Sequence, residues 1–196
     1  MRRLTIALVL AACNAIAQEA QATCAKGLIA DLASGSDVIL NLQANEIDIW
    51  GAEQNRIRVS CDFRERAAQA PQVKLELKPA GKGYAVTVEG GRSRDLHLRI
   101  EVPKNTNLVM RARSGDVRID SVIGNKDVAL KSGDLTIAVG NPADYSHADA
   151  SVRMGDLNAF AFGPARDRWN RHFEKDNPAG KYRLHAHVGF GSLVLQ

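Results

Sequence analysis

The chain has 196 residues and a mass of 21.2 kDa, which suits a single domain with a sizeable core and leaves too little length for two. Its 26 basic and 22 acidic residues give a formal net charge of +4, which falls to +2 (24 against 22) if Arg2 and Arg3 are removed with a leader. So small a charge excludes the strongly basic class of nucleic-acid-binding proteins, and we expect no nucleic acid partner.

The first residues have the layout of a secretory signal. Arg2 and Arg3 precede an apolar run that ends at Ala12, and polar residues interrupt it before it reaches the roughly 20 residues of a membrane-spanning helix. A small residue at both ends of a triplet allows cleavage after Ala17 or after Ala22. The sequence therefore predicts residues 1–17 as a signal peptide and a protein exported to the periplasm, the medium or the cell surface.

A third cleavage pattern would change where the protein is held. Leu10-Ala11-Ala12-Cys13 resembles the lipobox of bacterial lipoproteins, in which the cysteine is acylated and becomes the new first residue. Only twelve residues precede Cys13, which is short for such a signal. We favour the unlipidated form and keep a lipid anchor at Cys13 as the alternative; only then would a membrane be a partner.

Two cysteines remain after the leader. In an oxidising compartment Cys24 and Cys61 are expected to form a disulfide that ties the lead-in, residues 18–34, to the body of the domain. The alternative is a pair of free thiols, with Cys61 acting as a small core residue.

From Asp37 onward apolar residues occupy every second position in short runs, which is the period of β-strands with one buried face. Glycine-containing turns between the early runs predict hairpins, and Pro103 should end a strand because it lacks a backbone donor. The expected early strands contain Val38 to Leu42, Ile57 to Phe63, Val73 to Leu77, Tyr84 to Val88 and Leu96 to Val102.

After Pro103 the alternation becomes a repeat. Ser114-Gly115-Asp116-Val117 is followed 18 positions later by Ser132-Gly133-Asp134-Leu135, then by Met154-Gly155-Asp156-Leu157 and by a degenerate copy at Phe190-Gly191-Ser192-Leu193. Glycine is suited to turn each corner, and aspartate is suited to cap it through nearby backbone amides. We predict structural turns at Gly115, Asp116, Gly133, Asp134, Gly155, Asp156 and Gly191.

The repeat predicts an all-β, single-domain fold over residues 35–196. Stacked copies would share one core and pair each other's backbone edges, so we expect a β-solenoid-like stack of short strands with Gly-Asp corners, preceded by antiparallel strands and hairpins. A chain of ordinary hairpins is the alternative, although it would not keep Gly-Asp in phase. Residues 163–180, rich in charge and bounded by glycines, are expected to be a loop insertion between the third and fourth copies.

Together, the strand that ends in Val102-Pro103 and the following SGDV, SGDL and MGDL corners resemble the putative-adhesin family of bacterial cell-envelope proteins. The resemblance covers roughly residues 35–196 and implies a β-solenoid-like fold outside the cytoplasm. It implies no reaction. Ser192, in place of the corner aspartate, and the 163–180 insertion depart from the family pattern.

Histidines give the main metal candidates. His185 and His187 should point to the same face of one strand, and His147 lies on the polar side of another, so the three are weak candidates for binding zinc or copper. The stronger interpretation is a set of polar side chains on the wet side of amphipathic strands. Calcium binding by the corner aspartates is also disfavoured, because capping of the corners explains why these aspartates recur.

No nucleophile with a base, metalloprotease motif or phosphate-binding loop is recognisable, so we predict a protein without enzymatic activity or cofactor. The leading hypothesis is an exported envelope protein that presents a β surface to a macromolecular or surface partner, as an adhesin does. A periplasmic or envelope-stress accessory factor is the alternative, and a metal-binding protein is the least favoured.

Overall fold

The computed structural model describes residues 19–63, 72–90, 96–163 and 171–196 and confirms an all-β protein. Within these ranges no helix is long and apolar enough to cross a membrane. Short 3-10 turns lie between strands at η2 (Pro142–Asp144) and η3 (Phe160–Phe162). The strands are β1 (Ala20–Thr23), β2 (Leu28–Asp31), β3 (Asp37–Leu42), β4 (Glu46–Ala52), β5 (Arg56–Phe63), β6 (Lys74–Ala80), β7 (Gly83–Glu89), β8 (Leu96–Pro103), β9 (Asn107–Ser114), β10 (Asp116–Asp120), β11 (Lys126–Ser132), β12 (Leu135–Ile137), β13 (Tyr145–Asn158), β14 (His172–Asp176) and β15 (Tyr182–Leu195).

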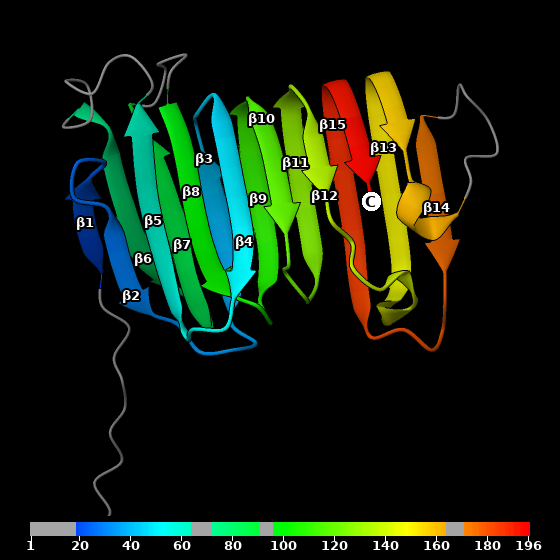
Figure 1. Cartoon of the computed structure of the whole chain (residues 1–196), viewed down its shortest axis with the longest axis horizontal. Coiled ribbons are helices and arrows are strands. Elements are labelled where there is room, and N and C mark those ends of the chain that lie inside the picture. Colours follow the sequence, from blue (N-terminus) through cyan, green and yellow to red (C-terminus); the bar gives the residue numbers. More distant parts are fainter. Residues whose placement is uncertain (1–18, 64–71, 91–95, 164–170) are drawn as a thin grey trace, which may run out of the picture.

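All fifteen strands belong to one sheet that folds over into two facing layers (Figure 1). One layer runs β1-β6-β7-β3-β9-β11-β15 and the other β15-β12-β10-β4-β8-β5-β2, so β15 contributes to both. At the opposite end β1 and β2 are consecutive in the chain. The result is a flattened, nearly closed, barrel-like sheet, which differs in detail from the solenoid that the repeat predicted.

The centre of the molecule is a parallel stack. β3, β9, β11, the first half of β15 and the first half of β13 lie side by side in one layer, while β4, β10, β12 and the second halves of β15 and β13 do so in the other. The copies do not follow chain order, because the last one, β15, lies between β11 and the third copy, β13. We refer to one copy, with its two strand segments and its corner, as a rung.

Two expectations about residues before 104 need correction. They were expected to form antiparallel strands and hairpins, but β3 and β4 are themselves a rung, because both pair in parallel with strands of the stack. The β6–β7 hairpin exists, with Lys74 opposite Glu89. β7 and β8 form no hairpin, since β7 pairs with β3 and β6 in one layer and β8 pairs with β4 and β5 in the other.

The glycine corners lie next to one another along one edge of the stack. Gly115, Gly133, Gly155 and Gly191 all have φ between 124° and 134°, a region that favours glycine. They are also too close to their neighbours for a side chain: a Cβ on Gly133 would lie 2.1 Å from the carbonyl oxygen of Gly115. Of the corner aspartates, Asp134 accepts hydrogen bonds from the backbone and hydroxyl groups of Ser192 in the next rung.

The disulfide Cys24–Cys61 is present, with Cα atoms 5.2 Å apart. It links the turn between β1 and β2 to β5, and so fastens the end of the flattened sheet where the two layers meet. Inside the layers the alternating apolar residues are buried, as the period of two predicted; Val38, Leu40 and Leu42 expose no more than 2% of their surface.

The interpretation of residues 163–180 as a loop is wrong for its second half, where β14 pairs antiparallel with β13 and extends the stack by one strand. Phe173 of β14 packs against Phe162, with ring centroids 5.1 Å apart. The first half, residues 164–170, lies outside the described residues, as do the predicted signal peptide (1–17) and Cys13.

Candidate functional site

Four of the five histidines lie on the outward side of three neighbouring strands at the end of the stack. β15 carries His185 and His187, β13 carries His147, and β14 adds His172, which the sequence analysis had not considered as a metal ligand. We call the outward side chains of β9, β11, β15, β13 and β14 the histidine face.

Each histidine of this face has a polar partner. His147 Nδ1 lies 2.7 Å from an Asp176 carboxylate oxygen, and His185 Nδ1 lies 2.5 Å from Asp149. His187 Nδ1 lies 2.9 Å from the Ser151 hydroxyl. Because most of these partners come from a neighbouring strand, the pairs tie β15, β13 and β14 together across the outer surface.

The face continues in the same pattern beyond the histidines. On β9 and β11, Arg111 donates to the Asp127 carboxylate at 2.6 Å and to the Asp127 carbonyl at 2.9 Å. Asp127 lies opposite His185, which in turn lies opposite Asp149. A row of alternating acids and bases therefore crosses the strands from β9 to β13, giving a polar and nearly flat surface suited to hydrogen-bonding a large partner.

The predicted metal ligands do not come together as one set. Among the described residues, His147 groups with Glu174 and Asp176, whose ligand atoms all lie within 4.8 Å of one another, while His185 and His187 have other partners. One imidazole and two carboxylates fit the ligand chemistry of zinc. All three are at least partly exposed, and carboxylates of this kind are common on surfaces without a metal.

A second group lies on the other layer, where β4 and β8 pair. His97 Nε2 lies 2.8 Å from Asp48, with Glu46 close by, and His97 is only 8% exposed. The sequence analysis missed this group because Glu46 and Asp48 are about fifty residues away from His97. Its burial between paired strands is typical of a contact that stabilises the fold.

The structure also contains a buried lysine that the sequence analysis missed. Lys126 is 2% exposed, and its Nζ donates to the Tyr145 hydroxyl at 2.5 Å. Burial lowers the pKa of Lys126 from 10.5 to about 8, and burial, with Asp144 and Tyr182 nearby, raises the pKa of Tyr145 to about 12. The alternation could have revealed Lys126, because it stands in phase with the inward residues Val128 and Leu130.

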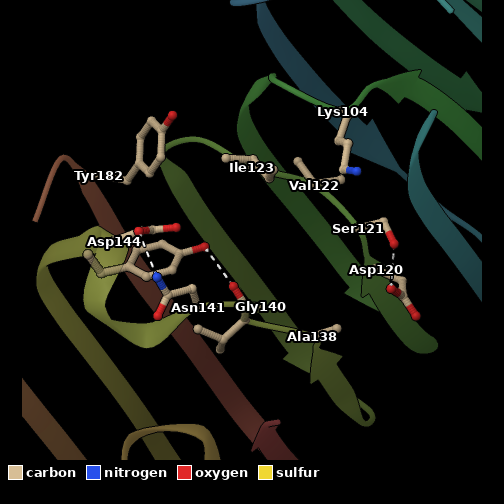
Figure 2. Close-up of a pocket in the computed structure, with 12 residues that line it drawn as sticks. Lys104, Asp120, Ser121, Val122, Ile123, Ala138, Gly140, Asn141, Asp144 and Tyr182 are labelled. Carbon is tan, nitrogen blue, oxygen red and sulfur yellow. Dashed lines mark hydrogen bonds between the residues drawn. The ribbon is translucent and has the colours of Figure 1, made fainter. Parts of the chain in front are cut away.

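Tyr145 forms part of the wall of a pocket of about 290 Å³. The pocket lies at the edge of the stack opposite the glycine corners, and Figure 2 shows the residues that line it. Around it Ser121 donates to Asp120 and Asn141 donates to Asp144, each at 2.9 Å. The Tyr145 hydroxyl also donates to the Val139 carbonyl at 3.3 Å. The polar groups near this pocket thus largely satisfy one another, as those of the histidine face also do.

No family model and no curated protein matches the chain. Two solved structures do. A putative cell adhesion protein from Clostridium sporogenes ATCC 15579 is 11% identical and aligns over 91% of this chain and 99% of its own, with a TM-score of 0.51. A putative adhesin from Bacteroides fragilis NCTC 9343 is 5% identical over 91% of this chain and 97% of its own, with a TM-score of 0.32, too low to carry an argument. The first likeness shows a shared fold, which agrees with the resemblance to the putative-adhesin family drawn from the corners.

Proposed function

We propose that the protein is an exported, non-enzymatic binding protein of the cell envelope, and that the histidine face binds its macromolecular partner. The observation that carries the proposal is the continuous row of paired acids and bases across neighbouring strands, from Arg111 and Asp127 to His185 and Asp149. Such a surface offers many hydrogen-bonding groups in fixed positions to an extended partner.

The construction of the stack supports this role. Residues that face inward form one continuous apolar core, and the corners leave no room for side chains, so the outer face is held rigidly. We interpret the rungs as a rigid, solenoid-like scaffold. In this scaffold the last copy, β15, lies between the second copy, β11, and the third copy, β13. A rigid surface loses little conformational entropy when it binds.

Two further points support export and adhesion. A disulfide between Cys24 and Cys61 is typical of an oxidising compartment outside the cytoplasm. A solved protein that shares the fold is described as a putative cell adhesion protein. Export predicts that the mature protein begins at Gln18 or Thr23, which intact-mass analysis of protein from the producing cells can check; an acylated Cys13 would instead reveal a lipoprotein.

Binding can be tested with a matched pair of charge exchanges. One variant combines Arg111→Asp with Asp127→Arg on the histidine face, and the control combines Arg118→Asp with Asp120→Arg on the opposite layer. Both original pairs are exposed ion pairs, and both exchanges preserve net charge. Fluorescent beads coated with each protein are offered peptidoglycan, lipopolysaccharide and collagen surfaces.

The proposal expects the native protein to hold beads on at least one of these surfaces, the face exchange to reduce attachment at least tenfold, and the control to retain it. Equal loss in the two variants would show that the histidine face is not the binding surface. Attachment to none of the three surfaces, or a wholly periplasmic location by protease treatment of intact cells, would contradict an adhesive role.

A further inference from the structure

The edge formed by the glycine corners carries three parallel rows of side chains. Two residues before the corner glycines stand the cations Arg113, Lys131 and Arg153, and directly after the glycines stand the acids Asp116, Asp134 and Asp156. Between them, immediately before the glycines, stand Ser114, Ser132, Phe190 and Met154, which lie opposite one another on successive strands. We call this edge the corner ridge; it lies along the top of the stack in Figure 1.

The two charged rows face opposite sides of the molecule. Arg113 follows the buried Ala112 and points outward from the layer that contains β9, whereas Asp116 precedes the buried Val117 and points outward from the layer that contains β10. The same alternation holds at the other corners. The ridge is therefore basic along one side and acidic along the other.

Most of these charges have no partner among the residues that the structure describes. In the described part of the structure, no ion pair or hydrogen bond involves the side chains of Arg113, Lys131 or Arg153, and all three residues are exposed. Arg111, two positions before Arg113, is by contrast paired with Asp127. Asp116 and Asp156 likewise have no ion-pair partner among the described residues.

The rung formed by β15 lacks both charges at once. Gly189 stands in the basic row and Ser192 in the acidic row, so the two gaps fall on the same strand. The apolar side chains are concentrated there instead: Phe190 is 43% exposed and its neighbour Met154 55% exposed, two of only four large hydrophobic residues so exposed in the described structure.

We propose that the corner ridge binds a second copy of this chain. A two-fold rotation about an axis parallel to the stacking direction keeps the order of the strands and exchanges the two sides of the ridge. The basic row of one copy then faces the acidic row of the other, rung by rung. Cation meets acid at β9, β11 and β13, gap meets gap at β15, and Phe190 and Met154 each meet their own copies in the middle.

The shape of the ridge determines what kind of dimer this is. Successive rungs lie about 4.8 Å apart, so the contact is a narrow strip, and its area falls at the small end of specific interfaces. Much of its attraction comes from exposed charges, which salt screens at distances of about 8 Å under physiological conditions. The dimer is therefore weak, reversible and salt-sensitive.

The test uses sedimentation velocity on the disulfide-bonded protein and on two reversed variants. One variant places acids on both sides of the ridge at the β9 and β13 rungs through Arg113→Glu with Arg153→Glu, and the other places bases on both sides there through Asp116→Lys with Asp156→Lys. Neither touches Asp134, whose carboxylate bonds Ser192. A control with the same change in net charge as the first variant combines Lys82→Glu and Lys181→Glu, at the edge of the stack opposite the corners.

Native protein and control should sediment with twice the monomer mass at about 0.05 M salt and shift towards monomer at about 0.5 M. Each reversed variant alone should be monomeric, whereas an equal mixture of the two should form a heterodimer, because their ridges are then complementary. A misfolded variant could not recover in this way. A native protein that is monomeric at low salt, or a mixture that stays monomeric, would overturn the proposal; binding of lipopolysaccharide by monomers through the basic row would assign that row to an anionic glycan instead.

Discussion

Replacing Lys126 by methionine should stabilise the protein at neutral pH. Lys126 is buried among apolar side chains with a tyrosine hydroxyl and the Gly124 carbonyl as its polar contacts, at 2.5 Å and 3.4 Å, and no carboxylate pairs with it among the described residues. Its ammonium group therefore loses most of its hydration on folding without gaining an opposite charge. Methionine keeps the unbranched shape and removes the charge.

The lowered pKa sets the size of the effect. A fall from 10.5 to about 8 corresponds to about 3 kcal/mol, since each factor of ten in proton affinity is worth about 1.4 kcal/mol. Losing the hydrogen bond to Tyr145 should return about 1 kcal/mol of this, because the hydroxyl still donates to the Val139 carbonyl. We expect Lys126→Met to raise the free energy of unfolding by about 2 kcal/mol at pH 7.

The sign of the pH dependence follows from the two pKa values. Below pH 8 the lysine is charged in both states, and the cost of burying that charge is fully present. Between pH 8 and 10.5 the folded protein has released the proton while the unfolded chain still binds it, so native stability rises with pH. The advantage of the methionine variant should therefore shrink between pH 7 and 9.5. Above pH 10 the raised pKa of Tyr145 acts in the opposite direction, because the unfolded chain ionises first.

Urea unfolding followed by tryptophan fluorescence can measure both effects. With a denaturant slope of about 2 kcal/mol/M, the midpoint at pH 7 should move up by about 1 M. Lys82→Met, in an exposed turn, should change stability by less than about 0.5 kcal/mol. A lower midpoint for Lys126→Met, or a gain of the same size at pH 7 and 9.5, would refute the account of Lys126 as an unpaired buried charge.

Two further predictions concern the corners and the disulfide. Gly133→Ala should lower the free energy of unfolding in urea by at least about 3 kcal/mol, because its Cβ would lie 2.1 Å from the Gly115 carbonyl oxygen. Gly35→Ala, also at positive φ but with open space around it, should lower it by only about 1 kcal/mol. Similar losses at the two sites would contradict a steric limit at the corners. Changing Cys24 and Cys61 to alanine should lower stability by about 4 kcal/mol, the chain-entropy value for a separation of 37 residues. Thermal unfolding with and without reductant checks this, and an unchanged midpoint in reductant would contradict it.

The sequence predicted the layers well because burial follows a period of two that is read locally. Val38, Leu40 and Leu42 point into the core as expected; Lys126 was missed because its charge argued against burial, although it stands in phase with buried residues. The repeated Gly-Asp motif likewise predicted where the corners at Gly115, Gly133 and Gly155 fall. These features depend on residues close together in the chain, where side-chain direction alternates in a fixed way.

The order of the rungs could not be predicted, because it depends on which distant edges pair. β15 could have followed β13, but it lies between β11 and β13, and this placement decides that His185 meets both Asp127 and Asp149. The first rung was missed because its corner lacks the glycine of the later copies. Ala44-Asn45 stands there, opposite Ser114-Gly115. β14 was interpreted as a loop because it is charged, as is usual for strands at the end of a sheet.

The inserted position of β15 also explains why this copy departs from the corner motif. Gly189 is buried between Lys131 and Arg153 of the adjacent rungs, and a Cβ there would lie 2.4 Å from the Lys131 carbonyl oxygen, so no cation can stand in the basic row at this rung. Ser192 donates its backbone and hydroxyl hydrogens to Asp134, and an ionised aspartate side chain in its place could not donate the second of these bonds. A neighbour on each side is not sufficient for these departures, because the β11 rung also has two neighbours and keeps Lys131 and Asp134. The departures that looked like decay of a repeat thus match contacts that β15 makes with the β11 rung.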